Sequence, residues 1–222
     1  MAEKIDYFFT LTSPWSYLGH ADFLRIATEH GVEVNYKPIP LQRLFPETGG
    51  LPLAKRHPAR QNYRMLELQR WREKRHLKLR LTPKFWPFDP ALVDRLIIAL
   101  VSSGAMVETF LPQAFMAVFA DEKNLADEAV LSALLSEAGL DAEAFMSLAK
   151  SESVAAEYEK NLQEALQIGI FGVPSYVLNG EIFWGQDRVE FLDEALKSHR
   201  AAYTSGHKEM TVGVTLEFPP IL

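Results

Sequence analysis

The sequence predicts an α/β fold in which a large helical insertion separates the two parts of one sheet. Three observations predict it: strand-like segments near both ends of the chain, a helix between the first two strands, and helical spacing through the middle. The expected order is a βαβ unit, a helical block, a β-hairpin and a last helix. We assign residues 1–42 and 170–200 to the sheet domain, 43–169 to the insertion and 201–222 to a tail.

The βαβ unit occupies the first forty residues. Apolar side chains alternate along residues 5–11, which is the period of a strand. A helix is expected to begin at Ser13-Pro14, because serine is a good N-cap and proline suits the first turn. Gly31 is the expected end of this helix. Alternation over residues 32–36 then predicts the second strand.

The middle of the chain is predicted to be helical. Residues 46–53 are rich in Gly and Pro and are expected to form a loop. Asp127, Asp141 and Ser153 are candidate N-caps, because their side chains can accept hydrogen bonds from a first helical turn. The expected helices cover about 59–76, 89–103, 106–119, 127–138, 141–150 and 153–168.

The last structured part is predicted to be a hairpin followed by a helix. Asn179-Gly180 is a strong two-residue turn signal between the strand-like runs 175–178 and 181–184. Residues 188–199 have the spacing of an amphipathic helix, and Asp187 is its expected N-cap. The tail has some alternation at residues 210–216, without a functional signal.

Composition narrows the classes of function. The net charge of −6 argues against a nucleic-acid partner, and no apolar run is long enough to span a membrane. The N-terminus lacks the features of a signal peptide, so we expect a cytoplasmic protein. Residues 55–84 nevertheless hold eleven Lys or Arg and only two acids, which suits a small anionic ligand or a solvated helix face. The six histidines lack metal-site spacing, so no metal is expected.

The chemistry is expected at the start of the first helix. Free N–H groups and the helix dipole there lower the pKa of a thiol held nearby. The chain contains no cysteine and places Ser13-Pro14-Trp15-Ser16 at this position. The Ser13 hydroxyl could donate a hydrogen bond to a thiolate supplied by a ligand, whereas no neighbouring base makes Ser13 a nucleophile. Ser-Pro is also an ordinary helix cap.

Four segments carry a resemblance to known proteins: residues 13–18, 68–71, 83–87 and 171–188, the last including Phe171-Gly172-Val173-Pro174 and Trp184-Gly185-Gln186-Asp187-Arg188. On these segments the chain resembles the DsbA-like branch of the thioredoxin superfamily. More narrowly, it is similar to the 2-hydroxychromene-2-carboxylate isomerases and the kappa-class glutathione transferases. The resemblance spans roughly residues 4 to 198. It implies a thioredoxin-like fold with a large all-helical insertion.

The resemblance further implies a glutathione cofactor. Ser13, with Pro14 and Trp15, would lie at its sulfur, and the backbone of Val173 before a cis-Pro174 would pair with its cysteinyl part. Gln186 and Asp187 would hold its γ-glutamyl end, and a basic residue would hold its glycine carboxylate. By spacing that residue is Arg60, with Lys55 as a rival. The residues implied for glutathione are therefore Ser13, Pro14, Trp15, Arg60, Val173, Pro174, Gln186 and Asp187.

Three functions follow as hypotheses. The first is a glutathione-dependent isomerase of a small aromatic or unsaturated carboxylate, acting by reversible thiolate addition. Trp15, Trp86 and Trp184 are candidates to line its substrate pocket, although tryptophan more often packs in a core. The second is a kappa-class-like glutathione transferase or peroxidase. The third is a non-catalytic, DsbA-like peptide-binding module. A homodimer is a further expectation from the family.

Overall fold

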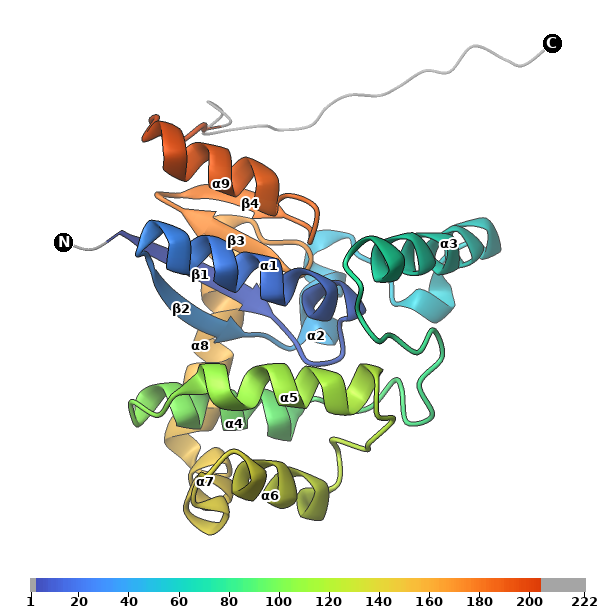
Figure 1. Cartoon of the computed structure of the whole chain (residues 1–222), viewed down its shortest axis with the longest axis vertical. Coiled ribbons are helices and arrows are strands. Elements are labelled where there is room, and N and C mark those ends of the chain that lie inside the picture. Colours follow the sequence, from blue (N-terminus) through green and yellow to red (C-terminus); the bar gives the residue numbers. More distant parts are fainter. Residues whose placement is uncertain (1–2, 205–222) are drawn as a thin grey trace.

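A four-stranded sheet forms the centre of the computed structural model, which describes residues 3–204 (Figure 1). Its strands are β1 (Lys4–Phe9), β2 (Glu33–Pro38), β3 (Ser175–Leu178) and β4 (Glu181–Trp184). Their order in the sheet is β2-β1-β3-β4. The predicted strands and hairpin are confirmed, except that the first strand ends two residues early. Most of the predicted tail lies outside the described residues.

The pairing directions bring two distant segments to one end of the sheet. β1 runs parallel to β2, with Ile5 opposite Val34, and antiparallel to β3, with Phe8 opposite Ser175. The chain therefore leaves β1 and enters β3 at the same end. The loop before the first helix and the loop before β3 meet there.

The helices agree with most of the sequence prediction. Asp127 and Asp141 are N-caps, as predicted, because their carboxylates accept from the N–H of Ala129 and Ala144. The described helices are α1 (Pro14–His30), α2 (Leu41–Thr48), the short 3₁₀ helix η1 (Leu53–Lys55), α3 (Pro58–Lys74), α4 (Ala91–Ser102), α5 (Val107–Phe119), α6 (Glu128–Glu137), α7 (Ala142–Ala149), α8 (Glu152–Ile168) and α9 (Val189–Ser198).

Three local predictions were wrong. The predicted loop at 46–53 begins inside α2, whose Leu44 is buried against the sheet. The N-cap of α8 is Ser151 rather than Ser153, because the extended backbone at Ser151 lets its hydroxyl accept from the N–H of Val154. Asp187 does not cap α9; Arg188 stands at the N-cap without a side-chain hydrogen bond.

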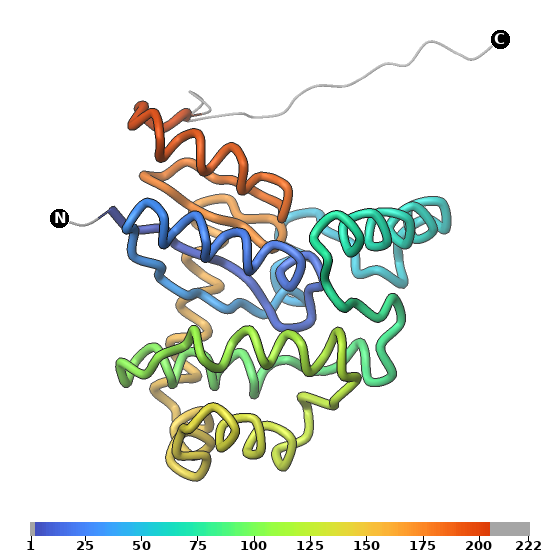
Figure 2. Tube along the Cα trace, viewed as in Figure 1, coloured from blue at the N-terminus to red at the C-terminus, as the bar shows by residue number. Residues whose placement is uncertain are grey.

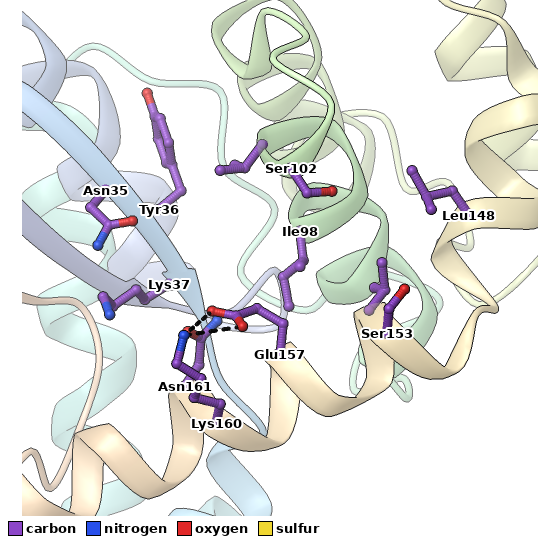
Figure 3. A pocket seen from close by; sticks show the side chains of 12 residues that line it. Asn35, Tyr36, Lys37, Ile98, Ser102, Leu148, Ser153, Glu157, Lys160 and Asn161 are labelled. Carbon is purple, nitrogen blue, oxygen red and sulfur yellow. Dashed lines mark hydrogen bonds and ion pairs between the residues drawn. The ribbon is translucent and has the colours of Figure 1, made fainter.

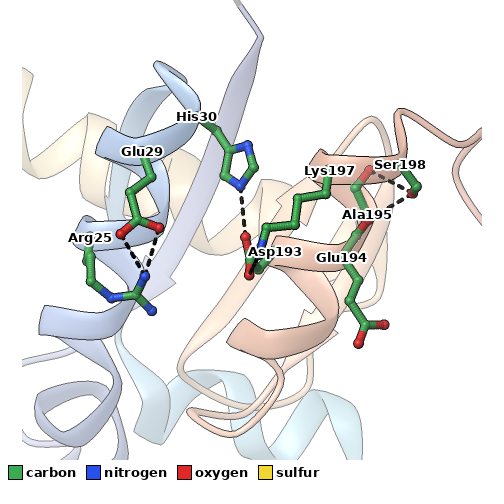
Figure 4. Close-up of polar contacts among 8 residues, drawn as sticks. All are labelled: Arg25, Glu29, His30, Asp193, Glu194, Ala195, Lys197 and Ser198. Carbon is green, nitrogen blue, oxygen red and sulfur yellow. Dashed lines mark hydrogen bonds and ion pairs between the residues drawn. The ribbon is translucent and has the colours of Figure 1, made fainter.

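Helices cover both faces of the sheet (Figures 1 and 2). On one face α1 and α9 pack together, and His30 of α1 bonds Asp193 of α9 at 2.8 Å (Figure 4). On the other face α2 and α8 pack, and Leu44 and Leu162 join a separate buried cluster with Val177. Both ends of the predicted insertion therefore belong to the layer that covers the sheet.

The remaining helices extend the molecule beyond the sheet. α4 packs on β2, α7 and α8, while α5 contacts α1 and α6 (Figure 1). Their buried faces are continuous with the main core through aromatic side chains such as Phe115 and Phe119. α3 lies to one side, near the start of α1. No helix within residues 3–204 is both long enough and apolar enough to cross a membrane.

Candidate functional site

The loop between β1 and α1 presents Ser13 as the N-cap of α1, as predicted. Its backbone is extended, with φ −91° and ψ 111°, and its Oγ accepts from the N–H of Ser16 at 3.1 Å. The hydroxyl proton is left to donate elsewhere, since this bond uses only a lone pair. Pro14 follows at the first helical position. The site thus combines a hydroxyl donor with the positive end of a 17-residue helix.

A buried carboxylate from α4 holds this loop in place. Asp94 accepts from Thr10 Oγ1 at 2.8 Å, from the N–H of Leu11 at 3.1 Å and from the Tyr158 hydroxyl at 2.9 Å. Burial raises the pKa of Asp94 to about 7, although the three hydrogen bonds act in the opposite direction. The sequence analysis did not identify Asp94. Its signal was an acid among the apolar side chains of a predicted helix.

Trp86 lies directly against the loop. Its indole N–H donates to the carbonyl of Thr12 at 2.8 Å. The guanidinium of Arg64, from α3, lies over the Trp86 ring at 5.2 Å from the centroid. Burial lowers the pKa of Arg64 to about 10, and the charge of Arg56 acts in the same direction. The peptide bond from Trp86 to Pro87 is cis.

The two residues implied for the glycine carboxylate lie near the start of α3, whereas a third cation, Arg64, is the one beside Trp86. Arg60 stands on the first turn of α3 and Lys55 at the end of η1, and both are exposed. Neither side chain pairs with a residue in the described part of the chain. Arg64 lies one turn further along α3 than Arg60 and is the cation that contacts Trp86. In the sequence, Arg64 is distinguished only as one cation of the basic segment 55–84.

The loop before β3 carries the predicted cis bond, between Val173 and Pro174. Residues 3–204 offer no hydrogen-bond partner to the backbone N–H or C=O of Val173. Trp184 lies beside this loop: its ring contacts Phe171 at a centroid distance of 4.5 Å, and a Cβ added to Gly172 would lie 2.5 Å from its Nε1. Val173 itself is buried, at 6% exposed. Its backbone edge is unpaired within the described residues and lies next to an indole that is 49% exposed.

Gln186 and Asp187 follow β4 and differ in their surroundings. Gln186 is 3% exposed, and its Oε1 has no partner among the described residues. The Asp187 carboxylate pairs with Arg188 at 3.1 Å and lies against Gly185, whose φ is +114°. Asp187 does not cap α9, so its carboxylate has Arg188 as its described partner and no backbone N–H of that helix.

Arg75, just after α3, joins the two sides of the site. Its Nη1 donates to the carbonyl of Leu18 at 2.8 Å, and its Nη2 donates to the carbonyl of Gln186 at 2.7 Å. It also pairs with Asp22 at 2.6 Å. Arg75 could not be separated from the other cations by sequence, since nothing in the local pattern indicates which arginine reaches two carbonyls.

Behind α1 lies a set of buried polar groups without partners among residues 3–204. It contains both ring nitrogens of His20 and the hydroxyls of Tyr7 and Tyr176. Burial lowers the pKa of His20 to about 3, so the ring is neutral near pH 7. The rings of Tyr7 and Tyr176 stack at 5.3 Å. These groups support the sheet side of α1 and do not reach the surface.

A cavity of about 460 Å³ lies at the β2 edge of the sheet, between β2, α4 and α8 (Figure 3). Its lining includes Tyr36, Lys37 and Asn161, and Glu157 pairs with Lys160 beside it. No predicted site residue lines this cavity. Residues 3–204 contain no group of three or more His, Cys, Asp or Glu side chains that could hold a metal ion.

Comparison with known proteins agrees with this architecture. The family model for the DSBA-like thioredoxin domain matches residues 4–197. A 2-hydroxychromene-2-carboxylate isomerase of Pseudomonas sp. (strain C18) is 31% identical over 199 residues, covering 86% of this chain and 89% of the relative. The isomerase of that name from Sphingobium xenophagum is 29% identical over 198 residues, covering 88% of this chain and 99% of the relative.

Solved structures show the same relationship. A structure of a 2-hydroxychromene-2-carboxylate isomerase matches with a TM-score of 0.76 and 25% identity, covering 88% of this chain and 95% of that one. A probable DsbA oxidoreductase from Streptomyces coelicolor matches with a TM-score of 0.71 and 22% identity, covering 91% of this chain and 93% of that one. The second likeness concerns the fold.

Proposed function

The chain belongs to the DsbA-like thioredoxin family and, within it, to the family of 2-hydroxychromene-2-carboxylate isomerases, and from this premise we propose a glutathione-dependent isomerase. Its substrate is a small aromatic or unsaturated carboxylate. The observation that carries the proposal is Ser13, a hydroxyl donor at the start of α1 in a chain without cysteine. Glutathione supplies, when bound, the thiol that adds reversibly to a conjugated carbon.

The residues around Ser13 fit this cofactor. The free backbone edge of Val173 suits the cysteinyl part, which pairs as an added strand does. The unpartnered Oε1 of Gln186 and the carboxylate of Asp187, which does not cap α9, are both hydrogen-bond acceptors. They suit the α-ammonium group of the γ-glutamyl end, which is a donor. Arg60 remains our choice for the glycine carboxylate, since it is exposed on the first turn of α3.

Within this proposal Ser13 has two functions. Its Oγ caps α1, and its proton stabilises the thiolate by a hydrogen bond, which together with the helix dipole lowers the thiol pKa. The substrate carboxylate is bound by Arg64 above Trp86, close to the same loop. A cationic site also stabilises the negative charge that develops on the substrate during addition.

The test measures bound glutathione and turnover in Ser13→Ala and Ser13→Thr. Thiolate absorbance against pH reports the thiol pKa, which should lie below its free value of about 8.5 in the wild type. Ser13→Ala should raise this pKa and slow isomerisation of 2-hydroxychromene-2-carboxylate by about a hundredfold, because it removes one donor to a developing charge. Ser13→Thr keeps the hydroxyl and should retain most of both properties.

Three further measurements separate the alternatives. S-Methylglutathione should bind without supporting turnover, since it has no thiol to ionise. Conjugation of chlorinated aromatic acceptors without any isomerisation would instead identify a transferase. Absence of glutathione binding at millimolar concentration, together with tight binding of an extended peptide, would identify a peptide-binding module. A homodimeric, cytoplasmic enzyme remains part of the proposal.

A further inference from the structure

The outer edge of β2 presents backbone groups to the cavity between β2, α4 and α8. At one end of the strand, the N–H of Glu33 donates to the carbonyl of Glu3. At the other end, the N–H of Ile39 donates to the carbonyl of Phe9. Because successive residues of a strand alternate, the odd-numbered residues face β1, and Tyr36 turns its N–H and C=O outward. Neither group has a hydrogen-bond partner in the described part of the chain.

The next outward residue of the strand shows which elements this edge faces. The carbonyl of Pro38 accepts from Nδ2 of Asn161, on α8, at 3.2 Å. Both Tyr36 and Asn161 line the cavity, and both are buried, at 7% and 3% exposed. Backbone groups of buried residues are paired in the great majority of cases. The outward N–H and C=O of Tyr36 are therefore groups that a ligand can satisfy.

The side chains around the cavity leave this backbone edge open. Figure 3 shows the side chains of Asn35 and Lys37 on the side of β2 away from Ile98. The volume of about 460 Å³ is within the usual range of small-molecule pockets. The apolar part of the lining comes from three helices and consists of Ile98 and Val101 on α4, Leu148 on α7 and Val154 on α8.

The charged side chains that line the cavity already have partners. Lys37 pairs with Glu164 at 2.5 Å, and Lys160 pairs with Glu157 at 3.0 Å. A charged ligand would find no free counterion among them, and it would lose its interactions with water without compensation. The cavity therefore favours an uncharged molecule.

We propose that the cavity at the β2 edge is a second ligand site, for a small uncharged amide with a branched aliphatic group. In an antiparallel pair, two opposite residues exchange both of their N–H···O=C bonds. One amino-acid unit between two amide groups is therefore the complement of Tyr36, and its aliphatic group lies against the apolar part of the lining. The site is separate from the loop of Ser13, since no residue implied for glutathione lines it.

A titration with N-acetyl-L-leucinamide, followed by the amide resonances of the full chain, tests this proposal. The probe has one residue between two amide groups and carries no charge, and a Kd of about 1 to 10 mM is expected for a molecule of its size. The amide of Tyr36 should be among the resonances with the largest saturable shifts. N-Acetyl-L-leucine has the same side chain but a carboxylate, and it should bind at least about tenfold more weakly.

Ser102→Phe and Ser103→Phe are matched variants at the end of α4. Both serine hydroxyls donate to the carbonyl of Ala99, but only Ser102 lines the cavity. Ser102→Phe places a ring in the cavity and should weaken binding of the probe at least about tenfold, whereas Ser103→Phe should leave the Kd within about twofold of the wild type. Dispersed amide resonances in both variants are the control for an intact fold.

Three results would overturn the proposal. The first is an absence of saturable shifts at about 50 mM probe, well above the expected Kd. The second is an equal loss of affinity in Ser102→Phe and Ser103→Phe. The third is binding of N-acetyl-L-leucine as tight as that of the amide, or saturable shifts confined to the loop of Ser13.

Discussion

Arg64 shows how a single residue acquires a role from its neighbours. Its guanidinium lies over Trp86, which is itself bonded to the loop of Ser13. Burial lowers the pKa of Arg64 to about 10. Among residues 3–204 no carboxylate pairs with its guanidinium. An incoming anion stabilises a partly buried cation that has no acid partner, because it replaces the interactions that the cation has lost with water.

Arg64→Gln and Arg60→Gln should separate the two anionic ligands. Loss of one charge-assisted contact costs about 1.5 to 3 kcal/mol, so Arg64→Gln should raise the KM of the carboxylate substrate tenfold or more. Its Kd for glutathione should remain close to that of the wild type. Arg60→Gln should show the reverse pattern in the same two measurements. A larger effect of Arg64→Gln on glutathione than on the substrate would contradict the assignment.

At the scale of elements, Arg75 at the end of α3 connects α1 to the loop after β4. Arg75 bonds the carbonyls of Leu18 in α1 and Gln186 after β4, and it pairs with Asp22. Close packing accompanies this link, because a Cβ added to Gly19 would lie only 3.0 Å from the Cβ of Gln186. α3 therefore sets the separation between α1 and the loop of Gln186.

Arg75→Met should destabilise the protein by about 2 to 4 kcal/mol, because it leaves two carbonyls and Asp22 without their donor. Urea unfolding measures the loss. Arg72→Met is the matched control on the same helix, since Arg72 makes only one described hydrogen bond, to the carbonyl of Leu79 at 3.2 Å. Arg72→Met should lower the free energy of unfolding by less than half as much as Arg75→Met. Equal losses in the two variants would show that the link between α1 and the Gln186 loop adds nothing.

At the scale of the whole molecule, Asp94 connects the insertion to the sheet. It lies on α4, receives Tyr158 from α8, and binds the loop between β1 and α1. Its pKa of about 7 in the folded state is above the ordinary value of 3.8. The folded state therefore holds a proton that the unfolded state has released between about pH 4 and pH 7, and stability falls as pH rises through this window.

Asp94→Asn should remove this fall in stability with rising pH, because the amide has no charged form. The unfolding free energy of the variant relative to the wild type should increase by about 2 to 4 kcal/mol from pH 4 to pH 7, as measured by urea unfolding at each pH. An offset that is the same at every pH would contradict the raised pKa.

The buried ring of His20 predicts the opposite dependence of stability on pH. Its pKa of about 3 lies below the ordinary 6.5, so its contribution is complete above pH 6.5 and is lost as pH falls toward 3. His20→Met should therefore make the protein less sensitive to acid, with a gain relative to the wild type that grows as pH falls from 6.5 to about 3. Acid unfolding followed by circular dichroism measures it. A midpoint unchanged from the wild type would contradict a neutral, buried ring.

The sequence alone was sufficient for features set by local rules. Alternation placed the first two strands, Asn179-Gly180 placed the hairpin and its two strands, and Ser13-Pro14 placed the start of α1. These depend on backbone geometry and capping, which neighbouring residues determine. The family segments likewise pointed to the cis bond before Pro174. The same local rules were wrong for Asp187 as a cap, where Arg188 lies between it and the helix.

Only the tertiary structure decided which polar side chains meet. Nothing in the local pattern distinguishes Arg64 or Arg75 from the other cations of residues 55–84, and Asp94 gave only an isolated signal. Their partners lie on elements distant in the chain, such as Thr10, Leu18 and Tyr158. Local preferences specify elements, whereas packing of those elements determines which groups lose water and which partners replace it.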